Sequence, residues 1–116
     1  RVREATKQGY AEAAVGDSIN LTAPDSTTPR GRVGKGIANT LDTGMQQHTL
    51  SPDSRIRRLT PIECERLMSW PDNWTEFGAY DGGHVCAPIS DSQRYKMCGN
   101  GVVSKVVEEI VRALLH

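Results

Sequence analysis

One short segment constrains the fold of this chain most strongly: residues 60–71, which specify a helix with defined ends. Thr60 is a good N-cap, and Glu63 follows it at the spacing of a capping box. Pro61 falls at the first helical position, where its missing N–H costs no hydrogen bond. Pro71 stops the pattern. We therefore expect a helix of about two to three turns that docks by its apolar side.

The first half of the chain predicts short elements separated by loops. Residues 2–14 are rich in helix formers, which favours a helix, and residues 17–21 alternate polar and apolar side chains, as in a short strand. Residues 23–36 are dense in Pro, Gly, Ser and Thr, which indicates a loop. A second strand is expected over residues 37–43 and a further loop over residues 44–54.

The second half is expected to be mainly helical. Residues 76–89 read as irregular, and Ser90 and Gln93 then repeat the capping-box spacing, which predicts a second helix. The Gly-Asn-Gly run at residues 99–101 ends it. Residues 102–115 carry one broad apolar face and predict the final helix. The fold class is therefore α+β, with short strands and loops followed by helices.

Composition narrows the classes of function. With 116 residues, 37% hydrophobic and 5% aromatic, the chain has the length of one domain and material for a modest core. Fourteen basic residues balance fourteen acidic residues, so the net charge makes no case for nucleic acid. No apolar run approaches the length of a membrane span, so no membrane partner is expected.

The three cysteines predict reduced thiols rather than a disulfide framework or a metal site. Cys64, Cys86 and Cys98 are an odd number without framework spacing, which is typical of a cytosolic protein. A Cys₃His zinc set would add His84, but no Cys-x-x-Cys pair exists. Cys64 and Cys98 fall in predicted helices and are expected to be small buried core residues.

Charge is nevertheless uneven along the chain. Residues 30–58 hold six basic and two acidic side chains, and glycines interleave the first part of this run. Glycines beside arginines let a backbone approach a phosphate while the side chains neutralise it. A solvated loop is the alternative interpretation. The basic residues are Arg30, Arg32, Lys35, Arg55, Arg57 and Arg58.

No catalytic centre is evident in the sequence. His48, His84 and His116 are scattered, and there is no nucleophile elbow, phosphate-loop signature or HExxH. No catalytic residue is therefore predicted. The backbone amides at the head of the final helix are nevertheless suited to a polar ligand.

Two segments together resemble a known family. Residues 56–72, IRRLTPIECERLMSWPD, resemble the ninth motif of the cytosine-5 DNA methyltransferases, R-x-L-T-P-x-E-x-x-R-L-Q-G-F-P. Met68, Ser69 and Trp70 replace the usual Gln, Gly and Phe or Tyr. The matching residues are Arg57, Leu59, Thr60, Pro61, Glu63, Arg66, Leu67 and Pro71.

The second segment is SQRYKMCGNGVV, residues 92–103, which is similar to the tenth motif, S-Q-x-Y-K-x-x-G-N-S-V. Gly101 stands where Ser is common. Residues 34–43, GKGIANTLDT, are similar to the family's target-recognition segment with its Thr-Leu pair. Order and spacing agree, so the chain is identified as the C-terminal part of a cytosine-5 DNA methyltransferase.

The resemblance implies an architecture and a division of labour. The family fold is a doubly wound, S-adenosylmethionine-dependent α/β domain with a small recognition domain. Residues 1–55 would be part of the target-recognition region, and residues 56–116 would carry the ninth and tenth motifs back to the catalytic domain. Four residues would be structural in the ninth motif: Thr60, Pro61, Glu63 and Arg66.

The resemblance also implies ligands. S-adenosylmethionine would be the cofactor, with Asn100, Gly101 and Val102 in the wall of its pocket. Double-stranded DNA would be the partner, read by recognition loops in the major groove, with Thr40 placed on phosphate. The DNA-binding candidates are Arg30, Arg32, Lys35, Thr40, Gln46 and Arg57.

The family reaction flips the cytosine out, adds a cysteine thiolate to C6 and transfers methyl to C5. The Pro-Cys, the F-x-G-x-G cofactor motif and the Glu-Asn-Val segment that this reaction uses are not in these 116 residues. The resemblance thus implies that the chain is inactive alone and works with the catalytic N-terminal portion of the same enzyme.

Three alternatives stay open: the recognition subunit of a split enzyme with a separate catalytic subunit, a non-catalytic DNA-binding module, and a truncated product without activity. The expected setting is the cytoplasm of a bacterium, with the gene bacterial or phage-encoded, and a restriction-modification context.

Overall fold

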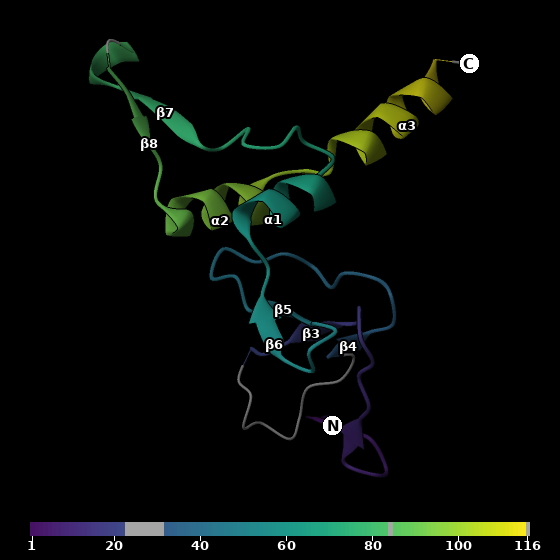
Figure 1. Cartoon of the computed structure of the whole chain (residues 1–116). Coiled ribbons are helices and arrows are strands. Elements are labelled where there is room, and N and C mark those ends of the chain that lie inside the picture. The colour runs from purple at the N-terminus through teal and green to yellow at the C-terminus, as the bar shows by residue number, and fades with distance from the viewer. Residues whose placement is uncertain (23–31, 84, 116) are drawn as a thin grey trace. The chain divides into compact units, whose positions relative to one another are not determined.

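The computed structural model describes residues 1–22, 32–83 and 85–115, which form two compact units. Unit 1 comprises Arg1–Leu41 and Met45–Leu59, and unit 2 comprises Asp42–Gly44 and Thr60–His116. The boundary expected between residues 55 and 56 falls inside unit 1. The expected mixture of short strands followed by helices is confirmed (Figure 1).

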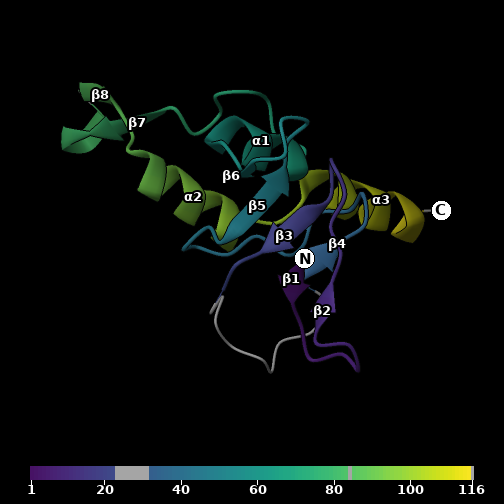
Figure 2. The same ribbon diagram turned by 60° about the horizontal axis from the view of Figure 1, so that its bottom comes forward.

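The described residues of unit 1 form two antiparallel sheets. The first pairs β1 (Val2–Arg3) with β2 (Tyr10–Ala11). The second has four strands in the order β4-β3-β5-β6 (Figure 2). Its strands are β3 (Ser18–Asn20), β4 (Val33–Gly34), β5 (Gln47–Leu50) and β6 (Ile56–Arg58).

The strand predicted over residues 17–21 is confirmed as β3, but four other predictions for this half are wrong. The loop expected over residues 23–36 contains β4, and its residues 23–31 lie outside the described residues. The helix expected over residues 2–14 is a strand pair, because Gly9, at φ +79°, turns the chain and its carbonyl accepts the N–H of Glu4 at 3.1 Å. Residues 37–43 form no strand, and residues 44–54, expected as loop, contain β5.

Unit 2 contains three helices and a hairpin. The helices are α1 (Pro61–Leu67), α2 (Asp91–Asn100) and α3 (Ser104–Leu114). Between α1 and α2, β7 (Phe77–Tyr80) pairs antiparallel with β8 (Val85–Pro88) across the short 3₁₀ turn η1 (Asp81–Gly83). The three predicted helices are confirmed, whereas the irregular segment predicted over residues 76–89 is a hairpin.

The predicted capping box of α1 is present. The hydroxyl of Thr60 accepts the N–H of Glu63 at 3.3 Å, and the carboxylate of Glu63 accepts the N–H of Thr60 at 2.9 Å. Pro61 occupies the first turn as expected. The helix ends at Leu67, before Pro71, because Ser69 adopts a left-handed conformation at φ +60°.

The last helix, α3, is exposed along its whole length. Lys105 pairs with Glu108 at 3.0 Å and with Glu109 at 3.5 Å, as its spacing predicts. Its apolar face is exposed as well, and no side chain caps its N-terminus. Among the described residues, α3 therefore contributes little to the core of unit 2.

The buried carboxylate of Glu65 joins the other elements of unit 2. Its side chain is 0% exposed and accepts hydrogen bonds from the N–H groups of Asn73 and Thr75 at 2.7 and 2.8 Å. It also accepts from the Thr75 hydroxyl and, at 3.1 Å, from the guanidinium of Arg94. One side chain of α1 thus fixes the loop that follows and holds α2.

These hydrogen bonds keep Glu65 ionised. Burial by itself would raise the pKa of Glu65, but the hydrogen bonds from Thr75, Arg94 and Asn73 outweigh burial and lower it. The Arg94 side chain is 11% exposed, so the two charges form a buried ion pair. A buried ion pair of this kind is costly to break from one side.

We expect Glu65→Ala to lower the free energy of opening of α1 and α2 by about 3–5 kcal/mol, because it leaves the Arg94 charge buried without its counterion. Amide hydrogen exchange in the intact protein measures this locally. Asp72→Ala is the matched control, since it breaks the exposed Arg66–Asp72 pair. Equal losses in the two variants would contradict the role of Glu65.

The same pair makes an acid-sensitive contact. Because the folded pKa of Glu65 lies below its ordinary value of 4.5, the stabilisation is present above that value and is lost as pH falls through the folded pKa. Glu65→Gln should therefore flatten the pH dependence of amide exchange in α1 at acid pH.

Gly99 allows a close approach of backbone to α2. A Cβ atom at this position would lie 2.5 Å from the carbonyl carbon of Asp42 and 2.6 Å from the nitrogen of Thr43. Backbone atoms cannot move aside as a flexible side chain can. The segment Asp42–Gly44 is therefore packed on α2 at the one position that lacks a side chain.

Gly99→Ala should destabilise α2 by about 1–3 kcal/mol, the usual cost of overpacking. The sign is diagnostic, because Gly→Ala in a helix with free space stabilises it by up to about 1 kcal/mol. Urea unfolding of the intact protein, followed by exchange of the α2 amides, gives the sign. An unchanged or more stable variant would show that this contact is not made.

Candidate functional site

The segment between α2 and α3 exposes several hydrogen-bond donors. Asn100, the last residue of α2, is exposed, and so are Gly101 and Val102. The N–H of Gly101 is used, since it donates to the carbonyl of Cys98 at 3.3 Å. Within the described part of the chain, the N–H groups of Val102 and Val103 have no hydrogen-bond partner.

This segment is held against the end of α1. The N–H of Ser104 donates to the carbonyl of Met68 at 3.1 Å. The indole N–H of Trp70 donates to the hydroxyl of Ser104 at 3.0 Å. Both contacts join Ser104 to the chain that leaves α1, so the C-terminal end of the exposed segment is fixed within unit 2.

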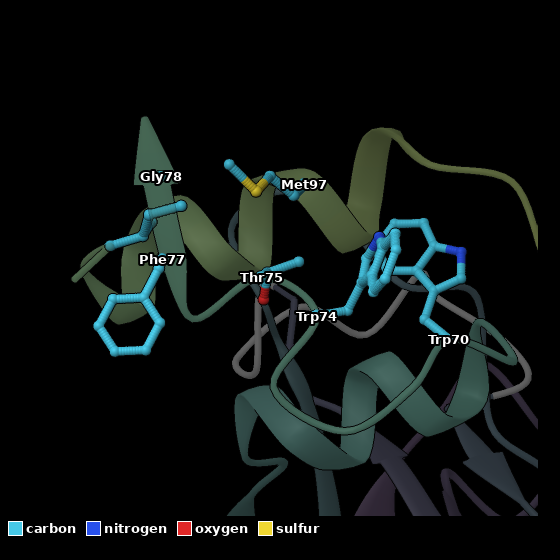
Figure 3. A pocket seen from close by; sticks show the side chains of 7 residues that line it. Trp70, Trp74, Thr75, Phe77, Gly78 and Met97 are labelled. Atoms are coloured by element: carbon cyan, nitrogen blue, oxygen red, sulfur yellow. The ribbon is translucent and has the colours of Figure 1, made fainter. Parts of the chain in front are cut away.

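An open apolar pocket of about 360 Å³ lies beside it on unit 2. Figure 3 shows the two indoles of Trp70 and Trp74 toward one end and the ring of Phe77 toward the other, with Met97 between them in this view. Trp74 is 67% exposed and Phe77 is also exposed. The other lining residues are Thr75, Gly78 and Ile89.

The exposed segment suits a small ligand with both polar and apolar parts. The amide of Asn100 both donates and accepts hydrogen bonds, two backbone N–H groups are free to donate, and Val102 offers apolar surface. These are donors and contacts that a ligand with polar and aromatic groups would use. The residues expected for the cofactor are thus adjacent and accessible.

In unit 1, exposed cationic side chains gather on β6. This strand lies at one edge of the sheet, and Arg57 and Arg58 are both exposed on it. Its neighbour β5 places Thr49 opposite Arg57 and His48 opposite Arg58. The guanidinium of Arg58 turns back to donate to the carbonyl of Met45 at 2.9 Å.

The other predicted DNA contacts lie differently. Arg32 is only 2% exposed, and its N–H donates to the carboxylate of Glu4 at 2.7 Å, so its side chain is not presented to a phosphate in this structure. Arg30 lies outside the described residues. Thr40 is exposed, and Gln46 is half-buried just before β5.

Lys35 is exposed but already engaged. Its ammonium lies 3.0 Å from a carboxylate oxygen of Asp17 and also donates to the carbonyl of Glu12. The N–H of Ala14, the ammonium of Lys35 and the N–H of Gly36 all donate to Asp17 and lower its pKa. Lys35 thus helps to fix the backbone that follows β4.

Several residues that organise these sites were not predicted. Glu4, Asp17 and Glu65 are buried carboxylates that bind backbone N–H groups. The spacing of the acidic residues in the sequence does not distinguish these three buried carboxylates from the exposed ones. Trp70 did carry a signal, because it and Gly101 both depart from the family's motifs.

Cys64 and Cys98 are buried, as expected, and Cys86 is exposed. In residues 1–22, 32–83 and 85–115, no cluster of His, Cys, Asp or Glu is arranged to bind a metal ion. His84 of the alternative zinc set, like His116, lies outside these ranges. No helix in the described part of the chain has the length and apolar character needed to cross a membrane.

Several curated proteins are similar to this chain. A stretch of 65 residues is 45% identical to the orphan methyltransferase M.SPRI of Bacillus phage SPR and covers 56% of this chain and 13% of that protein. Over 114 residues, 95% of the chain is 29% identical to 23% of the type II methyltransferase M.Sau3AI of Staphylococcus aureus.

A DNA-cytosine methyltransferase of Escherichia coli K12 is 38% identical over 65 residues, which are 56% of this chain and 12% of that protein. The chain therefore spans less than a quarter of the length of these relatives. No solved structure matches it significantly.

The family comparison covers nearly the whole chain. Residues 2–116 match the model of the C-5 cytosine-specific DNA methylases. The predicted family is thereby confirmed: the chain belongs to the C-5 cytosine-specific DNA methylase family.

Proposed function

We propose that the chain is the C-terminal portion of a DNA (cytosine-5-)-methyltransferase and contributes DNA target recognition and part of the S-adenosylmethionine pocket. The observation that carries the proposal is the exposed segment of Asn100, Gly101 and Val102. It presents unused donors at the position of the tenth motif and is anchored to the end of α1.

Unit 2 would return to the catalytic domain of an α/β methyltransferase fold. The bound cofactor supplies the methyl group that moves to C5 of cytosine. Asn100 and the N–H groups of Val102 and Val103 would bind its polar groups, and the Val102 side chain would exclude water. The catalytic cysteine would come from the N-terminal portion of the same enzyme.

The apolar face of α3 supports such a partner. Exposed apolar residues on one helix stripe are typical of a surface that packs in a larger core. The catalytic portion of the same enzyme, or a separate catalytic subunit, would cover it. The exposed apolar residues of α3 are Val106, Val107, Ile110, Val111 and Leu114.

Unit 1 would supply DNA recognition, as proposed for residues 1–55. The exposed arginines of β6 are suited to phosphates. Thr40, Lys35 and Gln46 are further candidates for DNA contacts. Lys35 would have to leave Asp17 to bind DNA. A non-catalytic DNA-binding module is the second candidate, because β6 could bind phosphates without any cofactor.

The proposal is tested by methyl transfer. The intact protein, meaning this chain together with the catalytic N-terminal portion, is expected to transfer a labelled methyl group from S-adenosylmethionine to C5 of cytosine in duplex DNA. A protein that binds DNA with no methyl transfer and no cofactor binding would favour the binding module instead.

Asn100→Ala should weaken S-adenosylmethionine binding about five- to tenfold, the loss of one net hydrogen bond. Isothermal titration calorimetry with the intact protein measures the change. Lys96→Ala is the matched control, because Lys96 is an exposed residue of the same helix. Unchanged affinity in Asn100→Ala would remove Asn100 from the pocket.

Arg57→Ala should weaken DNA binding about equally on all sequences and lower the salt slope by about 1, since one phosphate contact is lost. Fluorescence anisotropy at several salt concentrations gives both quantities. Arg66→Ala, which removes an exposed cation of unit 2, should leave the slope unchanged. A relaxed sequence preference with an intact slope would place Arg57 on a base.

A further inference from the structure

Trp70 contacts the proposed cofactor segment at the residue that has no side chain. We propose that Trp70 is a positioning residue: its indole fills the space of a side chain at position 101 and sets the path of residues 100–103. The inference rests on the proposed function for its consequence in cofactor binding, and on geometry for the contact itself.

The contact leaves no room for a Cβ atom. A Cβ on residue 101 would lie 2.7 Å from both Cζ2 and Cη2 of Trp70 and 3.0 Å from the carbonyl oxygen of Met97. Real Cβ atoms essentially never approach another heavy atom to 2.7 Å. The backbone of Gly101, at φ −81° and ψ 178°, is extended and open to any residue. The indole is therefore the main obstacle.

The indole is also held in place. Its N–H donates to the hydroxyl of Ser104 at 3.0 Å, and the N–H of Trp70 itself donates to the carbonyl of Glu65 at 2.9 Å. Ser104 is fixed in turn by its own N–H to Met68. Swinging the ring away from residue 101 would break the bond to Ser104, so the ring and the segment move together or not at all.

The two atoms nearest to position 101 belong to the benzene ring of the indole, which lies farther from the backbone than the single ring of Phe or Tyr. Phenylalanine at position 70 lacks Cζ2 and Cη2, so it would leave space for a small side chain at position 101. The ninth motif that this chain resembles has Phe or Tyr at the position of Trp70, and the tenth motif has Ser at the position of Gly101. The residue in this chain is therefore larger at position 70 and smaller at position 101.

Trp74 provides an internal comparison. It lines the same pocket and is 67% exposed, but its ring is not among the atoms nearest to position 101. If general aromatic packing set the path of the segment, the two tryptophans would be equivalent. If the contact with residue 101 sets it, only Trp70 matters.

The test is a double-mutant cycle in the intact protein with Trp70→Phe, Gly101→Ser and the double variant. The readouts are the amide-exchange rates of residues 100–104 and the dissociation constant for S-adenosylmethionine by calorimetry. Gly101→Ser alone should raise both the exchange rates and the dissociation constant about tenfold, and the double variant should return to within about threefold of the original protein.

The parallel cycle with Trp74→Phe is the control, and there the effect of Gly101→Ser should persist in full. Additive effects of Trp70→Phe and Gly101→Ser on exchange would overturn the proposal. So would rescue by Trp74→Phe equal to that by Trp70→Phe. Coupling in exchange without any coupling in the dissociation constant would overturn the positioning role in cofactor binding.

Failure of the proposed function gives a different result. The original protein would then bind no S-adenosylmethionine, while the exchange cycle would still report whether Trp70 and residue 101 are coupled. The packing of Trp70 against residue 101 is thus decided by exchange, and its use for a cofactor by calorimetry.

Discussion

The ionised carboxylate of Glu65 is the interaction on which unit 2 depends. It accepts four hydrogen bonds, from the loop after α1 and from Arg94 of α2. These hydrogen bonds favour the charged form, because protonation would occupy a lone pair that now accepts a bond and would remove the counterion of Arg94. The backbone carbonyl of Glu65 also accepts the N–H of Trp70, and the indole of Trp70 donates to Ser104. Glu65 is thus linked through Trp70 to the segment that follows α2.

The helices were predictable from sequence because their signals are local. A capping box and an apolar stripe depend on residues three or four positions apart, and α1, α2 and α3 all follow from them. The strands of unit 1 are two to four residues long and pair partners up to about thirty residues apart. Residues 2–14 are rich in helix formers, but propensity is only a weak constraint on structure, and a single turn at Gly9 outweighs it.

The candidate sites were predictable in part, for the same reason. Motif spacing predicted Asn100, Gly101 and Val102, which lie together because they are adjacent in the chain. Counting charges predicted Arg32 and Lys35 but did not reveal that Arg32 is buried and that Asp17 binds Lys35. Both outcomes depend on carboxylates more than fifteen residues away, and no local pattern marks these carboxylates.

The position of β6 at the rim of its sheet has a consequence for the free protein. An edge strand has a neighbouring strand on one side alone, and a strand of another molecule can join it on the other side. Arg57 and Arg58 are both exposed at this edge, so two copies that approached edge to edge would bring like charges together and repel each other. The charges proposed to meet phosphate would thus also oppose self-association through this edge while no DNA is bound.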